Sequence, residues 1–104
     1  MPRAEDFEAC RAFYRRCGST STILNDIEGL AVQIRELQQQ HLHKDGELST
    51  FGHALKGNPV INNRLALFTG LLKAHCFTAA RSQAVLLLFT YRKLVQQYTT
   101  QSDQ

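Results

Sequence analysis

The chain has 104 residues, of which 43% are hydrophobic and 20% charged, and it carries a formal net charge of +3 with a pI near 9.0. This length suits one soluble globular domain over residues 1–104 and is too short for two. The charge is well short of the dense Lys/Arg patch of proteins that bind mainly through phosphate contacts.

The first predicted element is a helix whose spacing places four residues on one face, namely Phe7, Cys10, Tyr14 and Cys17. Gly18 and the Ser/Thr residues after it combine a helix stop with N-cap residues for the next helix. In that helix the apolar seam repeats at intervals of four and three residues, which is a heptad pattern. Its members are Ile23, Ile27, Leu30, Ile34, Leu37 and His41.

A short helix is predicted for residues 47–56. Gly57, Asn58 and Pro59 then form a break with a helix stop, an N-cap and a first-turn proline. Two more seams with the same spacing follow, one of Ile61, Leu65, Phe68, Leu72 and His75, the other of Ala80, Ala84, Leu87, Tyr91, Leu94 and Tyr98. We therefore predict an all-α fold, an antiparallel helical bundle with three long helices and one or two short helical segments.

The last helix contains an unbroken apolar run from Val85 to Phe89. The run is too short to span a membrane, which requires roughly 20 apolar residues. We expect Val85 and Leu88 to widen the buried stripe, whereas Leu86 and Phe89 lie farthest from it. These two residues are therefore expected either to meet another helix of the chain or to line an exposed groove.

The sequence contains no motif of an active site or a metal centre. Its four histidines and three cysteines include no C-x-x-C or H-x-x-x-H pair that could build a tetrahedral site, so we expect no metal or other cofactor. A Gly-rich phosphate loop, a G-x-S-x-G elbow and paired catalytic carboxylates are also missing. We expect a protein that is not an enzyme, with free and mostly buried cysteines. The absence of a signal peptide indicates a cytoplasmic protein.

One candidate function is nucleic-acid binding. The helix, turn and helix predicted over residues 47–75 match the outline of a small helix-turn-helix DNA-binding regulator acting as a dimer. In this alternative, Asn62, Asn63 and Arg64 would read base edges, since Asn suits adenine and Arg suits guanine. The sparse Lys and Arg around them favour the other interpretation, in which they lie on the solvent face of a bundle helix.

Two segments carry a family resemblance. The stretch DIEGLAVQIRELQQQH, residues 26–41, resembles the first helix of the N-terminal regulatory (Habc) domain of syntaxin-type SNARE proteins, and TYRKLVQQYTTQSD, residues 90–103, resembles its third. The second helix of the family is continuous, whereas Gly57-Asn58-Pro59 interrupts it here. The resemblance implies a domain excised from a longer, membrane-anchored protein, located at the cytosolic face of a membrane.

The resemblance also implies a role and a partner. Such a domain regulates a syntaxin-like SNARE in vesicle fusion, binding an amphipathic SNARE helix or a Sec1-type regulator without inserting into the membrane itself. A groove that accepts an amphipathic helix needs exposed apolar side chains flanked by polar ones. The candidates for lining this partner-binding groove are Leu67, Leu86 and Phe89.

Overall fold

The computed structural model describes residues 1–16, 22–44, 47–48 and 50–102, and it confirms the predicted all-α bundle. The elements are α1 (Ala4–Arg16), α2 (Thr22–Leu42), β1 (His43–Lys44), β2 (Glu47–Leu48), α3 (Thr50–Lys56), α4 (Pro59–Lys73) and α5 (Phe77–Ser102). The two strands, which the sequence pattern does not predict, pair antiparallel with His43 opposite Leu48.

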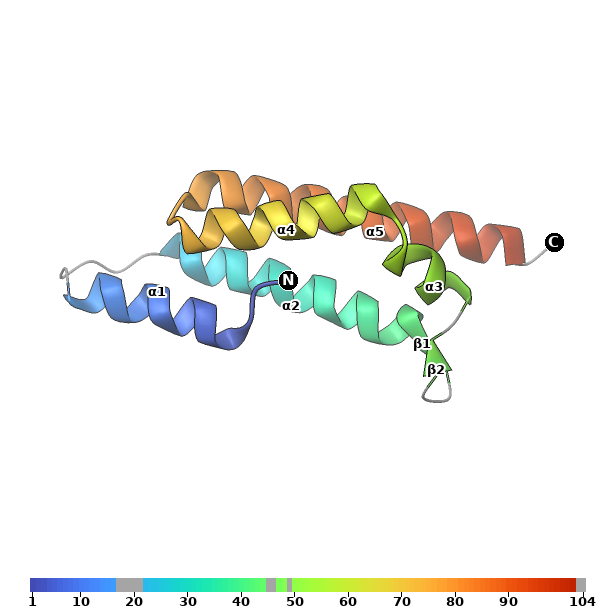
Figure 1. Ribbon diagram of the computed structural model, residues 1–104, viewed down its shortest axis with the longest axis horizontal. Helices are drawn as coiled ribbons and strands as arrows, with labels where there is room; N and C mark the ends of the chain where they lie inside the picture. The colour runs from blue at the N-terminus through green and yellow to red at the C-terminus, as the bar shows by residue number, and fades with distance from the viewer. Residues whose placement is uncertain (17–21, 45–46, 49, 103–104) are drawn as a thin grey trace.

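The three long helices, α2, α4 and α5, lie side by side along an elongated molecule with extents of 55 × 25 × 20 Å (Figure 1). Helices α2 and α5 run in the same direction, and α4 runs antiparallel to both. Helix α5 makes extensive contacts with α2 and with α4, whereas α1 contacts α2 and α4 more sparsely. The short α3 joins the strand pair to α4.

The break between α3 and α4 has the predicted chemistry. Asn58 is the N-cap of α4, and its Oδ1 accepts hydrogen bonds from the backbone N–H groups of Val60 at 2.9 Å and Ile61 at 3.2 Å. These bonds satisfy two donors that have no partner inside a helix. Pro59 occupies the first turn, where its missing N–H costs nothing.

The turn from α4 into α5 is closed without a glycine. The N–H of His75 donates to the carbonyl of Leu72 at 3.0 Å, and the N–H of Cys76 donates to that of Leu71 at 2.9 Å. These two bonds form a Schellman motif, whose C′ residue adopts a left-handed conformation. His75 has a φ of 62°, which is unfavourable for a residue with a side chain. Its ring is held between Phe13 of α1 and Phe77 of α5, with centroids at 5.0 and 5.5 Å.

The predicted seams supply most of the core. The fully buried apolar residues include Phe7, Ile27, Ile34, Ile61, Phe68, Leu72, Ala80, Ala84 and Leu87, all of which belong to predicted seams. Burying one such Leu, Ile or Phe side chain stabilises the fold by roughly 1.5–3 kcal/mol. Leu88 is also buried, as predicted.

One prediction about burial is wrong: Val85 is 50% exposed and lines a recess between α2 and α5 instead of widening the buried stripe. Of the three cysteines predicted to be free and mostly buried, Cys10 is buried and Cys76 is exposed in the turn before α5, and Cys17 lies outside the described residues. Burial raises the pKa of the Cys10 thiol, with a further contribution from Asp6.

Candidate functional site

The most exposed large apolar side chains of the bundle include three neighbours on α5. Val85, Leu86 and Phe89 are 50%, 44% and 65% exposed. Residues four apart on a helix lie one above the other, so Val85 and Phe89 form one row and Leu86 lies beside it. Single exposed apolar residues are common on protein surfaces, but a cluster of this kind is typical of an interaction site. We call these three residues the α5 face.

A shallow recess of about 370 Å³ lies on the α5 face. It is lined by Arg81, Ser82, Val85 and Leu86, so apolar side chains and the stem of an arginine form most of its wall. Phe89 follows Leu86 by less than one helical turn and continues the same surface. The recess can therefore accept an apolar side chain, while Phe89 offers a large ring beside it.

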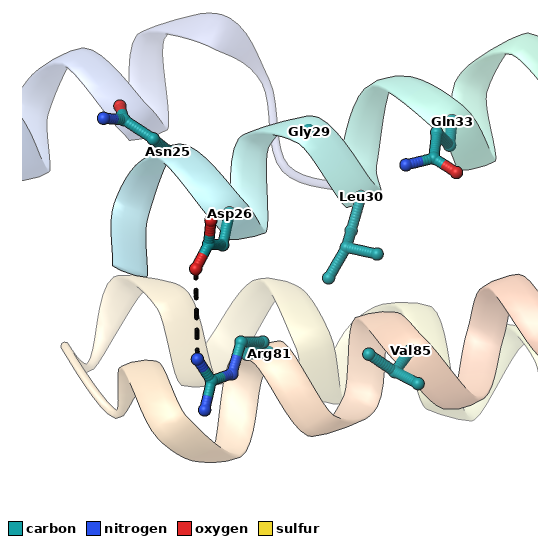
Figure 2. Close-up of a pocket in the computed structure, with 7 residues that line it drawn as sticks. All are labelled: Asn25, Asp26, Gly29, Leu30, Gln33, Arg81 and Val85. Carbon is teal, nitrogen blue, oxygen red and sulfur yellow. Dashed lines mark ion pairs between the residues drawn. The ribbon is translucent and has the colours of Figure 1, made fainter. Parts of the chain in front are cut away.

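A second recess of about 420 Å³ runs between α2 and α5. Its lining residues are Asn25, Asp26, Gly29, Leu30, Gln33, Arg81 and Val85 (Figure 2). Leu30 extends from α2 towards α5. Gly29, the residue before it, has no side chain, so this part of the recess wall is open. Val85 and Arg81 line both recesses, so the two form one continuous concave surface along α5.

Two polar contacts connect α2 and α5 at the ends of this recess. Arg81 pairs with Asp26, with 4.0 Å between Nη1 and Oδ2, and Arg92 donates from Nη2 to Oε1 of Gln33 at 3.1 Å. All four side chains are solvent-exposed, so each contact contributes little to the free energy of folding. Both guanidinium groups can therefore turn towards an incoming anionic partner at little cost.

Charge is divided unevenly along the chain. No Asp or Glu occurs between residues 48 and 102, a segment that contains α3, α4 and α5. The same segment carries the basic residues Lys56, Arg64, Lys73, Arg81, Arg92 and Lys93. Three of these residues, Arg81, Arg92 and Lys93, lie on α5 within about one turn of the α5 face, where positive charge can attract a negatively charged partner. The signal was present in the sequence as the absence of acidic residues between Glu47 and Asp103, but the net charge of the whole chain concealed it.

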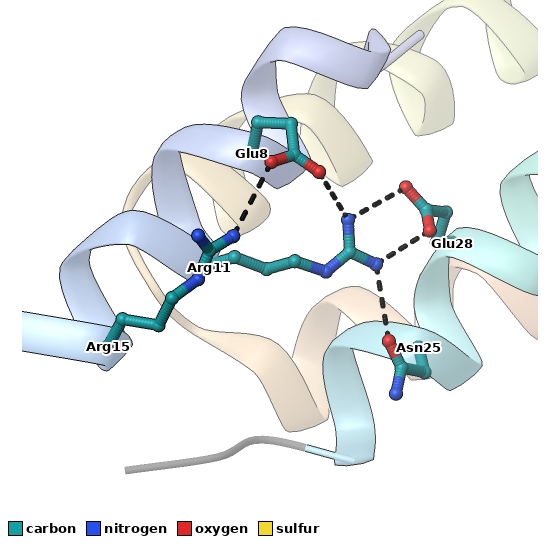
Figure 3. A network of polar contacts seen from close by, with 5 residues as sticks. All are labelled: Glu8, Arg11, Arg15, Asn25 and Glu28. Atoms are coloured by element: carbon teal, nitrogen blue, oxygen red, sulfur yellow. Dashed lines mark hydrogen bonds and ion pairs between the residues drawn. The ribbon is translucent and has the colours of Figure 1, made fainter. Parts of the chain in front are cut away.

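In helices α1 and α2, by contrast, acidic and basic side chains pair with one another (Figure 3). The Arg11 guanidinium forms two bonds to the Glu28 carboxylate, at 2.6 and 3.2 Å, and a third to Oδ1 of Asn25 at 3.2 Å. Glu8 also pairs with Arg11, at 3.1 Å, and with Arg15, at 3.6 Å. The hydrogen bonds from Arg11 lower the pKa of Glu28.

Of the predicted groove residues, the structure brings two together. Leu86 and Phe89 lie on the α5 face, and both are exposed. Leu67 is also exposed, at 48%, but it lies on the neighbouring helix α4. No prediction from the sequence included Arg81, Arg92 or Lys93, which flank the apolar residues on the same helix.

The residues of the predicted DNA-reading set lie near the start of α4. Asn63 is exposed, but Asn62 uses its side-chain amide to donate to the carbonyl of Lys56 at 2.9 Å. Arg64 is half-buried and donates to Oε1 of Gln83 on α5 at 3.4 Å. Two of the three side chains therefore have structural contacts within the bundle.

The described part of the chain has neither a metal-binding cluster nor a membrane-spanning helix. Its residues contain no cluster of three or more His, Cys, Asp or Glu side chains that could hold a metal ion. None of its helices is both long enough and apolar enough to cross a lipid bilayer.

Comparison of the chain with family models, with curated proteins and with solved structures gives no match.

Proposed function

We propose that this chain is a non-enzymatic helical interaction module that binds an amphipathic helix of a partner protein on the α5 face. The observation that carries the proposal is the 65% exposure of Phe89, a large apolar side chain beside an apolar recess. Aromatic residues next to pockets are the usual energetic centres of protein interfaces. A groove with apolar lining and polar edges is the site that an amphipathic helix occupies in helix-in-groove recognition.

The biological setting that we propose is the regulatory domain of a syntaxin-like SNARE in vesicle fusion. Two segments of the chain, residues 26–41 and 90–103, support it through their resemblance to helices of that domain. The arrangement of three long helices, with α4 antiparallel to α2 and α5, is compatible with it. In this setting the bound helix is a SNARE helix or a segment of a Sec1-type regulator.

The test is a fluorescence anisotropy titration with a labelled amphipathic helical peptide. Phe89→Ala is expected to weaken binding by about tenfold or more, since interface centres contribute at least 1–2 kcal/mol. Val32→Ala is the control, because Val32 is also exposed, at 43%, but lies on α2, outside both recesses. Circular dichroism should show that both variants remain folded. Equal binding by the wild type and Phe89→Ala would rule out the α5 face.

A DNA-binding regulator is the alternative function, and the absence of acidic residues between 48 and 102 favours it as well. It predicts binding of labelled duplex DNA that falls steeply with salt, because each neutralised phosphate releases counterions. It also predicts a loss of affinity in Arg64→Ala. Salt-sensitive duplex binding that Arg64→Ala abolishes, without any peptide binding, would replace the interaction module as the function.

A further inference from the structure

The α5 face combines an apolar cluster with basic residues on both sides of it along the helix. Arg81 lies one turn before Val85, and Arg92 and Lys93 follow Phe89 by about one turn. At a rise of 1.5 Å per residue, Arg81 and Arg92 are about 16 Å apart along the helix axis. Lys93 is exposed and makes no ion pair with any residue that the structure describes.

We propose that the partner is an acidic amphipathic helix, whose apolar stripe covers Val85, Leu86 and Phe89 and whose carboxylates pair with Arg81, Arg92 and Lys93. This inference rests on the proposed function and specifies the chemistry of the partner. It follows from charge complementarity, because Asp26, the acidic residue that lines the recess, already pairs with Arg81. Positive charges at both ends of an apolar site select a helix with negative charges about three turns apart.

A second copy of the chain fits this surface poorly. Helix α5 contains no acidic residue within the described range, so two α5 faces packed together have no opposite charges to pair. In an antiparallel arrangement, Arg81 of one copy lies beside Arg92 and Lys93 of the other. In a parallel arrangement, identical residues face each other. Like charges placed directly opposite across an interface oppose association in both cases.

The shape of the surface favours a helix over a lipid bilayer. Val85 and Leu30 line a concave recess between α2 and α5, and Gly29 keeps one side of it open. A ridge of side chains on a partner helix can enter such a recess, as in the packing of helix ridges into grooves. A flat membrane surface can reach Phe89 and Leu86 but leaves the recess unfilled.

The experiment compares two labelled helical peptides of about 18 residues, which is long enough to cover the face. Both carry the same leucine stripe, but one has glutamate and the other glutamine at the positions flanking it. The acidic peptide should bind the wild type about tenfold more tightly at about 50 mM salt, and the difference should shrink at about 500 mM. Lys93→Glu should remove this advantage and leave the glutamine peptide unaffected.

Lys73→Glu is the matched control, because it makes the same charge change on an exposed lysine at the end of α4, away from the face. It should keep most of the preference for the acidic peptide. A lysine-substituted peptide that binds Lys93→Glu more tightly than it binds the wild type would support the pairing directly.

The outcomes separate this inference from the proposed function. If the wild type bound both peptides with equal affinity and Phe89→Ala bound neither, the acidic partner would be wrong. The proposal of an interaction module would be retained. Binding of neither peptide would overturn both. Two other results would contradict an acidic helix as the partner. One is binding of the chain to vesicles containing phosphatidylserine, and the other is a dimer in light scattering. In each case, Phe89→Ala would have to abolish the association, and the acidic peptide would have to fail to compete with it.

Discussion

Helices α1 and α5 both pack against α2, but different interactions hold them. Helix α5 contributes five buried residues to the core, Ala80, Ala84, Leu87, Leu88 and Tyr91. Helix α1 contributes Phe7 and Cys10, and the polar network of Arg11 also joins it to α2. The comparison shows that the helix carrying the candidate site is better anchored in the core than α1. Its outer face can therefore carry exposed apolar residues without loss of the fold.

The largest expected effect tests the anchoring of α5. Leu87 is fully buried at the centre of the helix, so Leu87→Ala should lower the free energy of unfolding by about 2–5 kcal/mol. Leu86→Ala is the matched control, because the neighbouring leucine is 44% exposed and should lose less than about 0.5 kcal/mol. Chemical denaturation measures both. Similar losses for the two variants would mean that α5 is rotated relative to the structure described.

The next effect tests the turn where α1 meets the start of α5. His75→Ala and His75→Gly both remove the ring between Phe13 and Phe77, but only glycine adopts the left-handed φ of 62° without strain. His75→Gly should therefore be more stable than His75→Ala by about 1 kcal/mol. Thermal unfolding of the two variants gives the difference. A more stable alanine variant would contradict a left-handed residue at this turn.

The smallest effect tests the polar attachment of α1. Hydrogen bonds from Arg11 lower the pKa of Glu28 from its ordinary value of 4.5, so the charged form stabilises the fold. This contribution is present above about pH 4.5 and disappears as the pH falls through the lowered pKa. Because Glu28 is partly exposed, Glu28→Gln should cost less than about 1 kcal/mol at pH 7.

The difference between Glu28→Gln and the wild type should vanish in acid, at a pH below the pKa of Glu28 in the folded protein. Urea denaturation over a range of pH values measures it. Glu36→Gln serves as the control, since Glu36 is an exposed residue of α2 without an ion pair in the described part of the chain. A difference that grew as the pH fell would show that Arg11 does not stabilise the charged form of Glu28.

Much of the fold could be predicted because the signals are local. The N-cap at Asn58 depends on residues within three positions of it, and the seams depend on the period of the helix itself. The turn at His75 could not be predicted, because an aromatic contact with α1 holds a residue type that rarely adopts this conformation. The Arg11–Glu28 pair joins residues 17 positions apart, on different helices, so no local pattern contains it.

The candidate site could be predicted in part, for the same reason. Leu86 and Phe89 were identified because their angle from the buried seam follows from the sequence of α5 alone. Whether an apolar side chain is covered depends instead on the helix beside it. Val85 lines the recess between α2 and α5 and is 50% exposed there, which the sequence of α5 alone does not reveal.

The sequence by itself therefore determined the helices, their buried seams and the charge of the segment from 48 to 102, because all of these depend on the order of residues along one helix or segment. The tertiary structure decided that Val85 joins Leu86 and Phe89 at the surface and that Arg81 and Arg92 border the same recess. Burial and charge pairing between helices depend on which faces meet, and that depends on the packing of the whole chain.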